Sequence, residues 1–314
     1  MDLSIIVPVY NEEESLPELE AWIRRVLEEE NQFTYEIVMV DDGSTDTSWN
    51  VIEQLSSKNA NVKGIKFQRN YGKSAALNTG FAASSGDVVV TMDADLQDSP
   101  DELPELFRMV KEEGYDIVSG WKKKRYDPLS KTIPSKIYNW VTRKVSGIDL
   151  HDFNCGLKAY RSNVVKSIEV YGEMHRYIPL IAKWAGFKKI GEKVVQHRAR
   201  KYGVTKFGAK RVVSGFLDLL SVFFLGRFGK NPMHFFGALG SLCIFVGFAI
   251  LIYLSIAKLV YEAYGIADRP LFFFGILVFI IGTQLFVTGF LAELITRSAA
   301  DRNQYLIEEK IGIS

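Results

Sequence analysis

The chain has 314 residues and a formal net charge of +1, which argues against a protein that binds nucleic acid through bulk charge. The near-zero total hides a division, because residues 1–210 carry most of the charged side chains while residues 233–295 are mostly apolar. The length and this division predict about two domains, one polar and one apolar. Cys155 and Cys243 fall in different parts, so no disulfide is expected.

Strand-like and helix-like segments alternate through the first 120 residues. The first helix begins with a capping box from Ser15 to Glu18 and runs on to Leu27. Short loops between alternating elements are typical of an α/β fold with a mostly parallel sheet. The predicted strands are 4–9, 36–40, 62–67, 88–92 and 116–120, and the later helices are 46–57, 73–83 and 101–113.

Polar side chains gather where three of these strands end. Glu12 follows the first strand, Asp41 the second and Asp93 the fourth. In a parallel sheet these ends share one edge, which is where open α/β sheets bind ligands. Each position also fits a plain structural role, Glu12 as a first-turn helix acid and Asp42-Gly43 as a turn. Together the acids favour a nucleotide cleft, in which they accept hydrogen bonds from a ribose or a base.

The segment Asp93-Ala94-Asp95-Leu96-Gln97 has the composition of a cation site. Two carboxylates and an amide oxygen, spaced by one residue each, can face one hard divalent cation, and a diphosphate can supply its further oxygen ligands. The pattern therefore predicts a nucleoside-diphosphate enzyme. No glycine-rich phosphate loop follows the first strand, which disfavours ATPases and Rossmann dehydrogenases.

The last third of the chain contains two long apolar segments. Residues 233–257 and 271–292 are uncharged and long enough to cross a hydrocarbon core of about 30 Å as helices, with a buried soluble hairpin as the alternative. Basic residues precede the first segment and follow the second, so the positive-inside rule predicts a cytoplasmic N-terminal part and tail. Residues 212–228 carry a polar stripe at helical spacing, which predicts a helix in the membrane surface, with a third crossing as the alternative.

These features predict four parts along the chain. They are a cytoplasmic α/β domain over 1–210, an interfacial amphipathic helix over 211–230, a two-helix transmembrane hairpin over 231–297 and a cytoplasmic tail over 298–314. Residues 121–150 interrupt the α/β alternation with many lysines and arginines. Of these, Lys122–Lys124 are expected to form a solvated basic face.

Four motifs occur in order along the first hundred residues. They are Ile6-Val7-Pro8-Val9-Tyr10-Asn11-Glu12, Val40-Asp41-Asp42-Gly43-Ser44-Thr45-Asp46, Arg69-Asn70-Tyr71-Gly72-Lys73 and Asp93-Ala94-Asp95-Leu96-Gln97-Asp98. Together they resemble the motifs of the family 2 glycosyltransferases. The nearest subgroup is the polyprenyl-phosphate glycosyltransferases, which include dolichyl-phosphate mannose synthases and bacterial glucosyl and arabinosyl lipid synthases. The resemblance covers residues 3 to about 210, and the paired C-terminal spans match the same subgroup. The Gln-x-x-Arg-Trp motif of the processive synthases is absent from the sequence.

The resemblance implies a GT-A fold and assigns roles to individual residues. It implies nucleotide binding by Pro8, Tyr10, Glu12, Asp41 and Asp93, and Mg²⁺ or Mn²⁺ binding by Asp93, Asp95 and Gln97. Asp152, in the segment His151-Asp152-Phe153-Asn154-Cys155-Gly156, would lie near the acceptor. The implied catalytic residues are Asp152, Asp95, Arg125 and Arg200, and those for the acceptor phosphate are Arg125, Lys131, Ser135, Arg198, Arg200 and Lys206.

The function implied by the resemblance is inverting transfer of a hexose to undecaprenyl or dolichyl phosphate. UDP-glucose is the expected donor, with GDP-mannose, UDP-N-acetylhexosamine and a modified arabinose as alternatives, and diacylglycerol is the alternative acceptor. The intact acidic set argues against a non-catalytic membrane scaffold. The enzyme is expected at the cytoplasmic face of a bacterial inner membrane, supplying cell-envelope glycan or lipid modification. A dimer or tetramer is expected, with Gly237, Gly240 and Gly247 as candidate contacts between helices.

Overall fold

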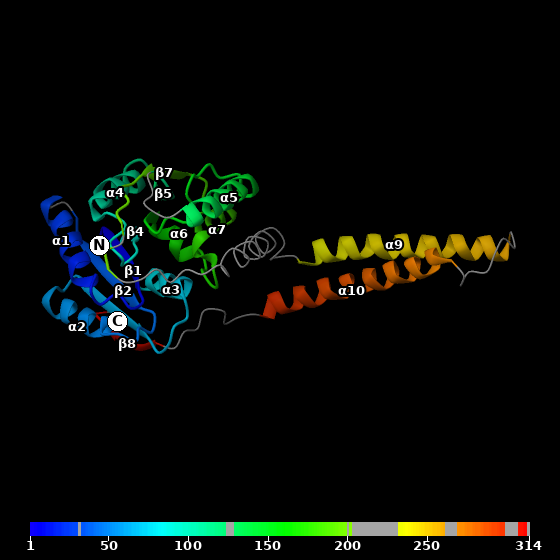
Figure 1. Ribbon diagram of the computed structural model, residues 1–314, viewed down its shortest axis with the longest axis horizontal. Coiled ribbons are helices and arrows are strands. Elements are labelled where there is room, and N and C mark those ends of the chain that lie inside the picture. The colour runs from blue at the N-terminus through cyan, green and yellow to red at the C-terminus, as the bar shows by residue number, and fades with distance from the viewer. Residues whose placement is uncertain are drawn as a thin grey trace. The chain divides into compact units, whose positions relative to one another are not determined.

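The computed structural model describes residues 1–30, 33–123, 129–199, 201–202, 232–260, 269–298 and 307–312. The chain divides into two compact units, Met1–Leu220 with Asn303–Ser314 and Ser221–Arg302 (Figure 1). The surface helix predicted at 211–230 lies outside the described residues.

The first unit is built on one mixed sheet with the strand order β7-β5-β6-β4-β1-β2-β3-β8. The pairs β1–β2, β1–β4, β2–β3 and β5–β7 are parallel, as the alternation of elements predicts. β6 is antiparallel to both β4 and β5, and β8 is antiparallel to β3. The strands are β1 (Leu3–Val9), β2 (Tyr35–Asp41), β3 (Val62–Phe67), β4 (Val88–Thr91), β5 (Ile117–Trp121), β6 (Lys158–Arg161), β7 (Ile190–Val194) and β8 (Ile307–Ile311).

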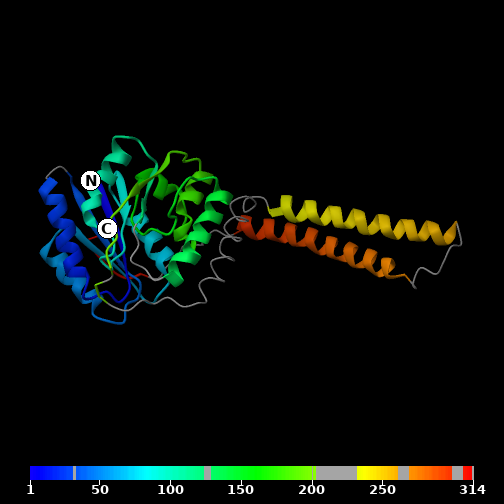
Figure 2. The same ribbon diagram turned by 45° about the horizontal axis from the view of Figure 1, so that its top comes forward.

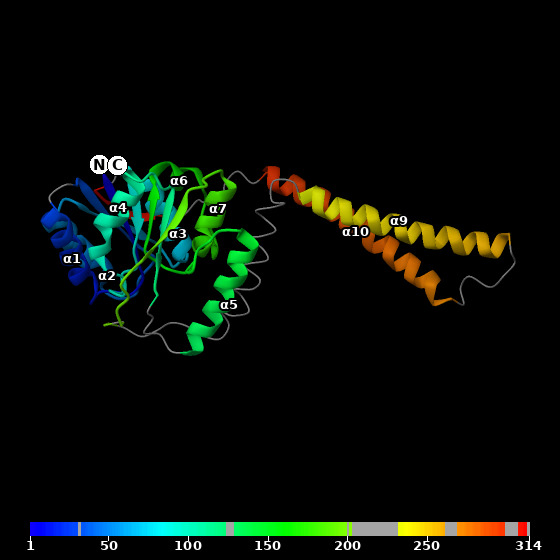
Figure 3. The same ribbon diagram turned by 90° about the horizontal axis from the view of Figure 1, so that it is seen from above.

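Helices cover both faces of this sheet, which is why the central strands are apolar on both sides. α1, α2 and α4 pack on one face, and α3 and α6 on the other (Figure 1). α5 is a long helix at the side of the unit (Figure 3). The helices are α1 (Leu16–Glu30), α2 (Ser48–Lys58), α3 (Lys73–Ala83), α4 (Leu103–Lys111), α5 (Leu129–Ser146), α6 (Ser162–Ser167) and α7 (Ile178–Trp184), with 3-10 turns at η1 (Pro100–Glu102) and η2 (Met174–Arg176).

Close packing of α3 on β1 depends on one glycine. A Cβ atom on Gly80 would come closer than 3.0 Å to the Ile6 side chain, which is fully buried. The alanine-rich sequence around Gly80 therefore lets α3 lie directly on the strands whose ends form the site. The first residue of α3 is consequently held at the same edge of the sheet as the ends of β1 and β2.

The later strands are the main difference from the sequence analysis, which did not predict β6, β7 or β8. β6 has four residues, and β7 is only half-buried, so neither carries a clear periodic pattern. Within the segment expected as a tail, Ile307–Ile311 forms β8 at the edge of the sheet. The C-terminal end of the chain thus joins the same sheet as the N-terminal strand.

The second unit is a pair of apolar helices, α9 (Pro232–Leu259) and α10 (Pro270–Ser298). Within them, the candidate spans Pro232–Leu259 and Pro270–Ala292 have mean hydropathies of 2.5 and 2.3, and both are long enough to cross a membrane. Figure 2 shows the two helices side by side. A Cβ on Gly240 would lie 2.7 Å from the Gly282 carbonyl, and one on Gly247 would lie 2.7 Å from the Phe279 amide. These glycines therefore let the two backbones touch within one chain.

Candidate active site

The predicted acids meet at one edge of the first unit. Parallel pairing sets Val9 beside Asp41, and Ile6 beside Thr91 of β4. Asp93 follows β4 by two residues, so it leaves the sheet at the same edge as Asp41. The structure thus brings together the ends of β1, β2 and β4, as the sequence predicts.

Asp41 is fully buried, and its two carboxylate oxygens differ. The Ser44 backbone N–H donates to Oδ1 at 3.0 Å, and the Ser44 hydroxyl donates to the same atom. Oδ2 is buried and has no hydrogen-bond partner among the described residues. Burial raises the pKa of Asp41 above its ordinary value, while the Ser44 bonds oppose that rise. A buried acceptor that lacks a donor can accept an N–H group of a bound base.

The neighbouring Asp42 fixes the loop that precedes α3. Its carboxylate accepts the Tyr71 N–H at 2.7 Å and the Gly72 N–H at 2.9 Å. Burial raises the pKa of Asp42 to about 6, against the lowering effect of these two bonds. Gly72 has a φ of +95°, a conformation that glycine adopts without strain, so the loop can turn directly into Lys73.

Lys73 begins α3 and forms an ion pair with Asp93 across the site. Burial opposes the charge on Asp93, but Lys73, Lys122 and His175 hold the pKa of that carboxyl below its usual range. Lys73 was not predicted as a site residue. The signals for it in the sequence are its place in the motif Arg69-Asn70-Tyr71-Gly72-Lys73 and its position at the start of a predicted helix.

The loop from Asp93 to Asp98 alternates between exposed and buried residues. Asp93, Asp95 and Gln97 are partly exposed, whereas Ala94, Leu96 and Asp98 are buried. Leu96 has a φ of 60°, and the Gln97 N–H donates to Asp95 Oδ1 at 3.2 Å. The three predicted metal ligands therefore share the accessible side of one tight loop.

A divalent cation fits this donor set. No group of three or more His, Cys, Asp or Glu side chains suited to a metal is present among the described residues. Asp93 and Asp95 nevertheless supply two hard oxygen ligands and Gln97 a third, which suits a cation that also takes diphosphate oxygens. The ammonium group of Lys73 is paired with the Asp93 carboxylate, which shows that a positive charge is stabilised next to Asp93.

The segment around Asp152 packs directly against this loop. Asp152 is buried, and its Oδ1 accepts the Asn154 N–H at 3.1 Å. A Cβ on Gly156 would come closer than 3.0 Å to the Asp93 carboxylate, so only glycine allows this approach. The Asp152–Gly156 segment and the Asp93–Gln97 loop are thus in contact.

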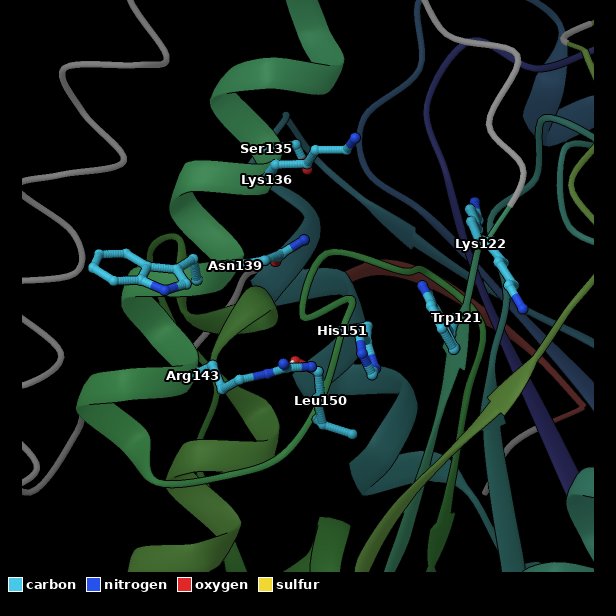
Figure 4. Close-up of a pocket in the computed structure, with 10 residues that line it drawn as sticks. Trp121, Lys122, Ser135, Lys136, Asn139, Arg143, Leu150 and His151 are labelled. Carbon is cyan, nitrogen blue, oxygen red and sulfur yellow. The ribbon is translucent and has the colours of Figure 1, made fainter.

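Beside the Asp152 segment lies a cavity of about 490 Å³ between α5 and the end of β5. On one wall the rings of Trp121 and His151 stack with centroids 4.0 Å apart, and His151 pairs with Glu192. Ser135, Asn139 and Arg143 line the opposite wall from one face of α5, and Figure 4 shows them facing Trp121 and His151. The other lining residues are Lys122, Lys123, Lys136, Trp140 and Leu150.

Asn139 connects this cavity to the acidic segment. Its side-chain oxygen accepts the Phe153 N–H at 3.2 Å, one residue beyond Asp152. The cavity therefore contains cationic and aromatic side chains and is structurally linked to Asp152. Ser135, which the resemblance assigns to the acceptor phosphate, lines the cavity. Asn139 and Trp121 were not predicted, because their meeting depends on the packing of α5 against β5.

The prediction that Lys122 belongs to a solvated basic face is wrong. Its side chain is 13 % exposed, and its ammonium nitrogen lies 2.6 Å from an oxygen of the fully buried Asp98. Burial opposes the charge, but Asp98 raises the pKa of Lys122 above its ordinary value. The pair connects Asp98, at the end of the Asp93–Asp98 loop, to the residue that follows β5. A run of three lysines in the sequence gives no sign that one turns inward.

Arg198 is not brought to the cavity that Ser135 lines. Its guanidinium lies 4.1 Å from the ring centroid of Trp22 and 3.9 Å from Asp101, while its backbone N–H donates to the Gln97 carbonyl at 2.9 Å. Lys131 lies on α5, but its side chain is outside the described part of the structure. Of the remaining predicted acceptor residues, Arg125, Arg200 and Lys206 are also outside it. Pro8, Tyr10 and Glu12 lie at the end of β1.

Comparison with known proteins places the chain in a family. Residues 4–168 match the model of glycosyl transferase family 2. The dodecaprenyl-phosphate galacturonate synthase of Rhizobium johnstonii is 36 % identical over 95 % of this chain and 88 % of its own length. The undecaprenyl-phosphate 4-deoxy-4-formamido-L-arabinose transferase of Proteus mirabilis is 34 % identical over 99 % of this chain and 94 % of its own.

A solved structure shares the fold. Glucosyl-3-phosphoglycerate synthase of Mycobacterium tuberculosis, in complex with Mn²⁺, UDP and its product, aligns with a TM-score of 0.55. The alignment covers 73 % of this chain and 80 % of that chain at 19 % identity, so it supports the GT-A fold alone. The acids that meet at one edge of the sheet agree with this fold. The match to the family model and the two relatives that align over nearly the whole chain show that the chain belongs to the family 2 glycosyltransferases.

Proposed function

We propose that this protein transfers a sugar from a nucleoside diphosphate to a polyprenyl phosphate, with inversion at the anomeric carbon. The observation that carries the proposal is the approach of Gly156 to Asp93, which sets the Asp152 segment against the accessible side of the Asp93–Gln97 loop. A donor diphosphate at that loop would lie beside an acceptor in the adjoining cavity. The long matches to two polyprenyl-phosphate sugar transferases support the same reaction.

At the donor side, Asp41 would accept an N–H of the base through its unpaired oxygen Oδ2. Asp93, Asp95 and Gln97 would hold Mg²⁺ or Mn²⁺ on the diphosphate. When bound, such a cation neutralises charge on the departing nucleoside diphosphate. Lys73 would hold Asp93 in place and add positive charge next to the diphosphate.

At the acceptor side, the cavity lined by α5 would receive the lipid phosphate. Lys123, Lys136 and Arg143 supply positive charge there, and Ser135 supplies a hydroxyl. A phosphate monoester has its second pKa near ~6 and is largely ionised at neutral pH, so it needs little help from a base. We therefore assign Asp152 to positioning. Its carboxylate is buried and already accepts the Asn154 N–H.

The reaction is balanced without a redox partner or a further co-reactant. An oxygen of the lipid phosphate forms a bond to the anomeric carbon, and the bond from that carbon to the diphosphate oxygen breaks. The nucleoside diphosphate leaves with the electron pair. The lipid-phosphate sugar, with its anomeric configuration inverted relative to the donor, stays in the membrane through its polyprenyl chain.

The expected UDP-glucose donor is replaced in this proposal by a modified sugar. The two relatives described above are named for galacturonate and for 4-deoxy-4-formamido-L-arabinose, not for glucose. A modified arabinose was among the alternatives that the sequence left open. We propose a UDP-linked uronic acid or modified pentose as the donor class, and undecaprenyl phosphate as the acceptor.

The location proposed for the enzyme is a bacterial inner membrane, with its catalytic unit in the cytoplasm. α9 and α10 are long and apolar enough to span a bilayer. Basic residues before the first apolar segment and after the second favour the cytoplasmic side for both ends of the hairpin. An acceptor phosphate at the bilayer surface could then enter the cavity while its chain stays in lipid.

The proposal is tested with purified full-length protein, undecaprenyl phosphate, Mn²⁺ and a panel of UDP-sugars that includes UDP-galacturonate, UDP-4-formamido-arabinose and UDP-glucose. Mass spectrometry of the lipid product should show one modified sugar attached to the polyprenyl phosphate. Asp93→Asn should abolish the product, whereas Asp87→Asn, which alters an exposed ion pair with Lys111, should not. Transfer to diacylglycerol, or no transfer to any lipid, would overturn the proposal.

A further inference from the structure

A small cavity adjoins Asp93 between α3, β6 and η2. Two of its lining residues approach the Asp93 carboxylate, Lys73 through an ion pair and Gly156 through its backbone. The volume is about 10 Å³, which leaves room for one small polar group. Among the described residues no Asp or Glu lines this cavity, whereas four basic residues do, namely Lys73, Lys158, His175 and Arg176.

Lys158 is the most deeply buried of these four residues, at 3 % exposed. It pairs with Thr91 of β4 in the middle of the sheet, and its ammonium group donates to the Cys155 carbonyl. Burial lowers the pKa of Lys158, while the charges of Asp152 and Asp93 oppose that change. Within the described part of the chain, however, this ammonium forms no ion pair with a carboxylate. A buried cation is costly unless an anion joins it.

Two further basic residues of the cavity come from η2. Arg176 is buried, and its guanidinium donates to Glu173 Oε2 at 3.1 Å. A guanidinium has five N–H donors, so this bond uses only part of its capacity. The ring of His175 is held by α3, because its Nδ1 lies 3.1 Å from the Ser74 hydroxyl. The packing of α3 and η2 therefore fixes both side chains beside the cavity.

The size and charge of the cavity distinguish between the groups that a nucleotide-sugar carries. A diphosphate is too large for about 10 Å³, and the Asp93–Gln97 loop already offers it a cation site. A sugar hydroxyl would fit but would leave the charge of Lys158 without a counterion. A carboxylate is small, carries a negative charge and accepts strong hydrogen bonds from ammonium and guanidinium groups.

We propose that this cavity binds the carboxylate of a uronic acid on the donor, with Lys158 and Arg176 as the residues that recognise it. The inference rests on the proposed function, and it selects the uronic acid from the two donor classes given there. The donor carboxylate would supply the counterion that Lys158 does not find among the described residues. A pentose without an acid group would not supply it.

The test compares UDP-galacturonate with UDP-galactose, which differ only in a carboxylate or a hydroxymethyl group on the sugar. Full-length protein in detergent with Mn²⁺ is titrated with each donor by calorimetry. The parent protein should bind UDP-galacturonate about tenfold more tightly or better. Lys158→Met and Arg176→Met should each remove most of this preference by weakening UDP-galacturonate alone. Lys166→Met is the matched control, because that ammonium also donates to backbone carbonyls but at the other end of α3, and it should keep the preference.

The melting temperature without ligand separates recognition from a structural role. Methionine has nearly the length of lysine, so Lys158→Met replaces a buried charge by an apolar group and should leave the melting temperature unchanged or raise it. A lower melting temperature together with weaker binding of both donors would overturn the proposal, because Lys158 would then serve the fold.

Two other results would also overturn it. Equal affinity of the parent protein for both donors would show that the carboxylate is not recognised, and an equal loss for both donors in Lys158→Met and Arg176→Met would assign these cations to the diphosphate. The transfer assay separates this failure from that of the proposed function. A lipid product formed from UDP-galactose in preference to UDP-galacturonate would contradict the inference alone, whereas a carboxylate preference in binding with no lipid product from any donor would contradict the proposed transfer.

Discussion

The ammonium group of Lys73 is paired with the carboxylate of Asp93, so the first residue of α3 contacts a predicted metal ligand at the end of β4. The pair neutralises Asp93 in the absence of a donor. A divalent cation that binds Asp93 must therefore compete with Lys73 or share the carboxylate with it. This relationship makes the charge balance of the cleft testable.

Replacing Lys73 by methionine should strengthen the response of the free protein to metal. Without the ammonium group, the pKa of Asp93 rises towards its usual range, and a bound cation becomes the main neutralising charge. Mn²⁺ alone should raise the melting temperature of Lys73→Met more than that of the parent protein, while transferase activity falls at least ~10-fold. Lys111→Met, which breaks a surface pair with Asp87, is the control. Equal Mn²⁺ shifts in parent and variant would contradict the competition.

A methyl group at Gly156 should damage the site with little effect on folding. Its Cβ would overlap the Asp93 carboxylate and displace that side chain from the predicted metal site. Gly156→Ala should lower kcat/KM by about 10²-fold or more, which corresponds to about 3 kcal/mol of transition-state stabilisation. Gly191→Ala provides a matched clash, with the Tyr115 ring and away from the cleft. If both variants keep full activity, the contact between Gly156 and Asp93 does not contribute to catalysis.

Asp42 should make the first unit less stable as the pH rises. Its folded pKa of about 6 exceeds the unfolded value near ~3.9, so the unfolded chain ionises first and stability falls between those two pH values. The full effect is on the order of 3 kcal/mol, and it is absent below about pH 4. Asp42→Asn should remove this dependence, and the unfolding free energies of parent and variant should diverge from about pH 4 to about pH 7.

The check on this prediction is denaturant unfolding of the full-length protein in detergent across that range. Asp87→Asn serves as the comparison, because Asp87 lies on the surface with its side chain 61 % exposed. A parent and an Asp42→Asn variant whose stabilities run parallel with pH would show that Asp42 is ionised normally in the fold.

Trp121 should matter for the acceptor more than for the donor. Its ring stacks on His151 and forms a wall of the cavity proposed for the acceptor. Trp121→Ala should raise the KM for polyprenyl phosphate about tenfold or more, with a smaller change in the KM for the nucleotide-sugar. Trp184→Ala, which removes an exposed indole at the end of α7, should leave both values near those of the parent. A rise confined to the KM for the nucleotide-sugar would show that the acceptor does not bind in this cavity.

The sequence predicted those parts of the site that depend on local pattern. Asp41 and Asp93 follow buried apolar runs, and parallel strands must end at a common edge, so their proximity followed from the order of elements. Lys122 could not be placed, because its burial depends on Asp98, which lies 24 positions earlier in the chain. The contact of Arg198 with Trp22 could not be predicted for the same reason, since it joins residues that lie 176 positions apart in the sequence.

The strands that follow α5 also could not be predicted from the sequence. β6 is too short for a period-two pattern, and it is antiparallel to its neighbours in a sheet that the alternation predicts to be mostly parallel. β8 pairs with β3 only after the chain has passed through the two apolar helices. Edge strands gain much of their stability from the strand that they join, and that partner is not visible in the local sequence.

The pairing of β8 with β3 limits the number of times that the chain can cross a membrane between these two strands. Gly64 and Ile65 of β3 pair with Ile311 and Lys310 of β8, so the chain leaves this sheet before α9 and re-enters it after α10. A chain that ends on the same sheet from which it started must cross any intervening bilayer an even number of times. Inserting or deleting one crossing would place β8 on the other side of the membrane from β3. The edge of β3 would then have no partner strand.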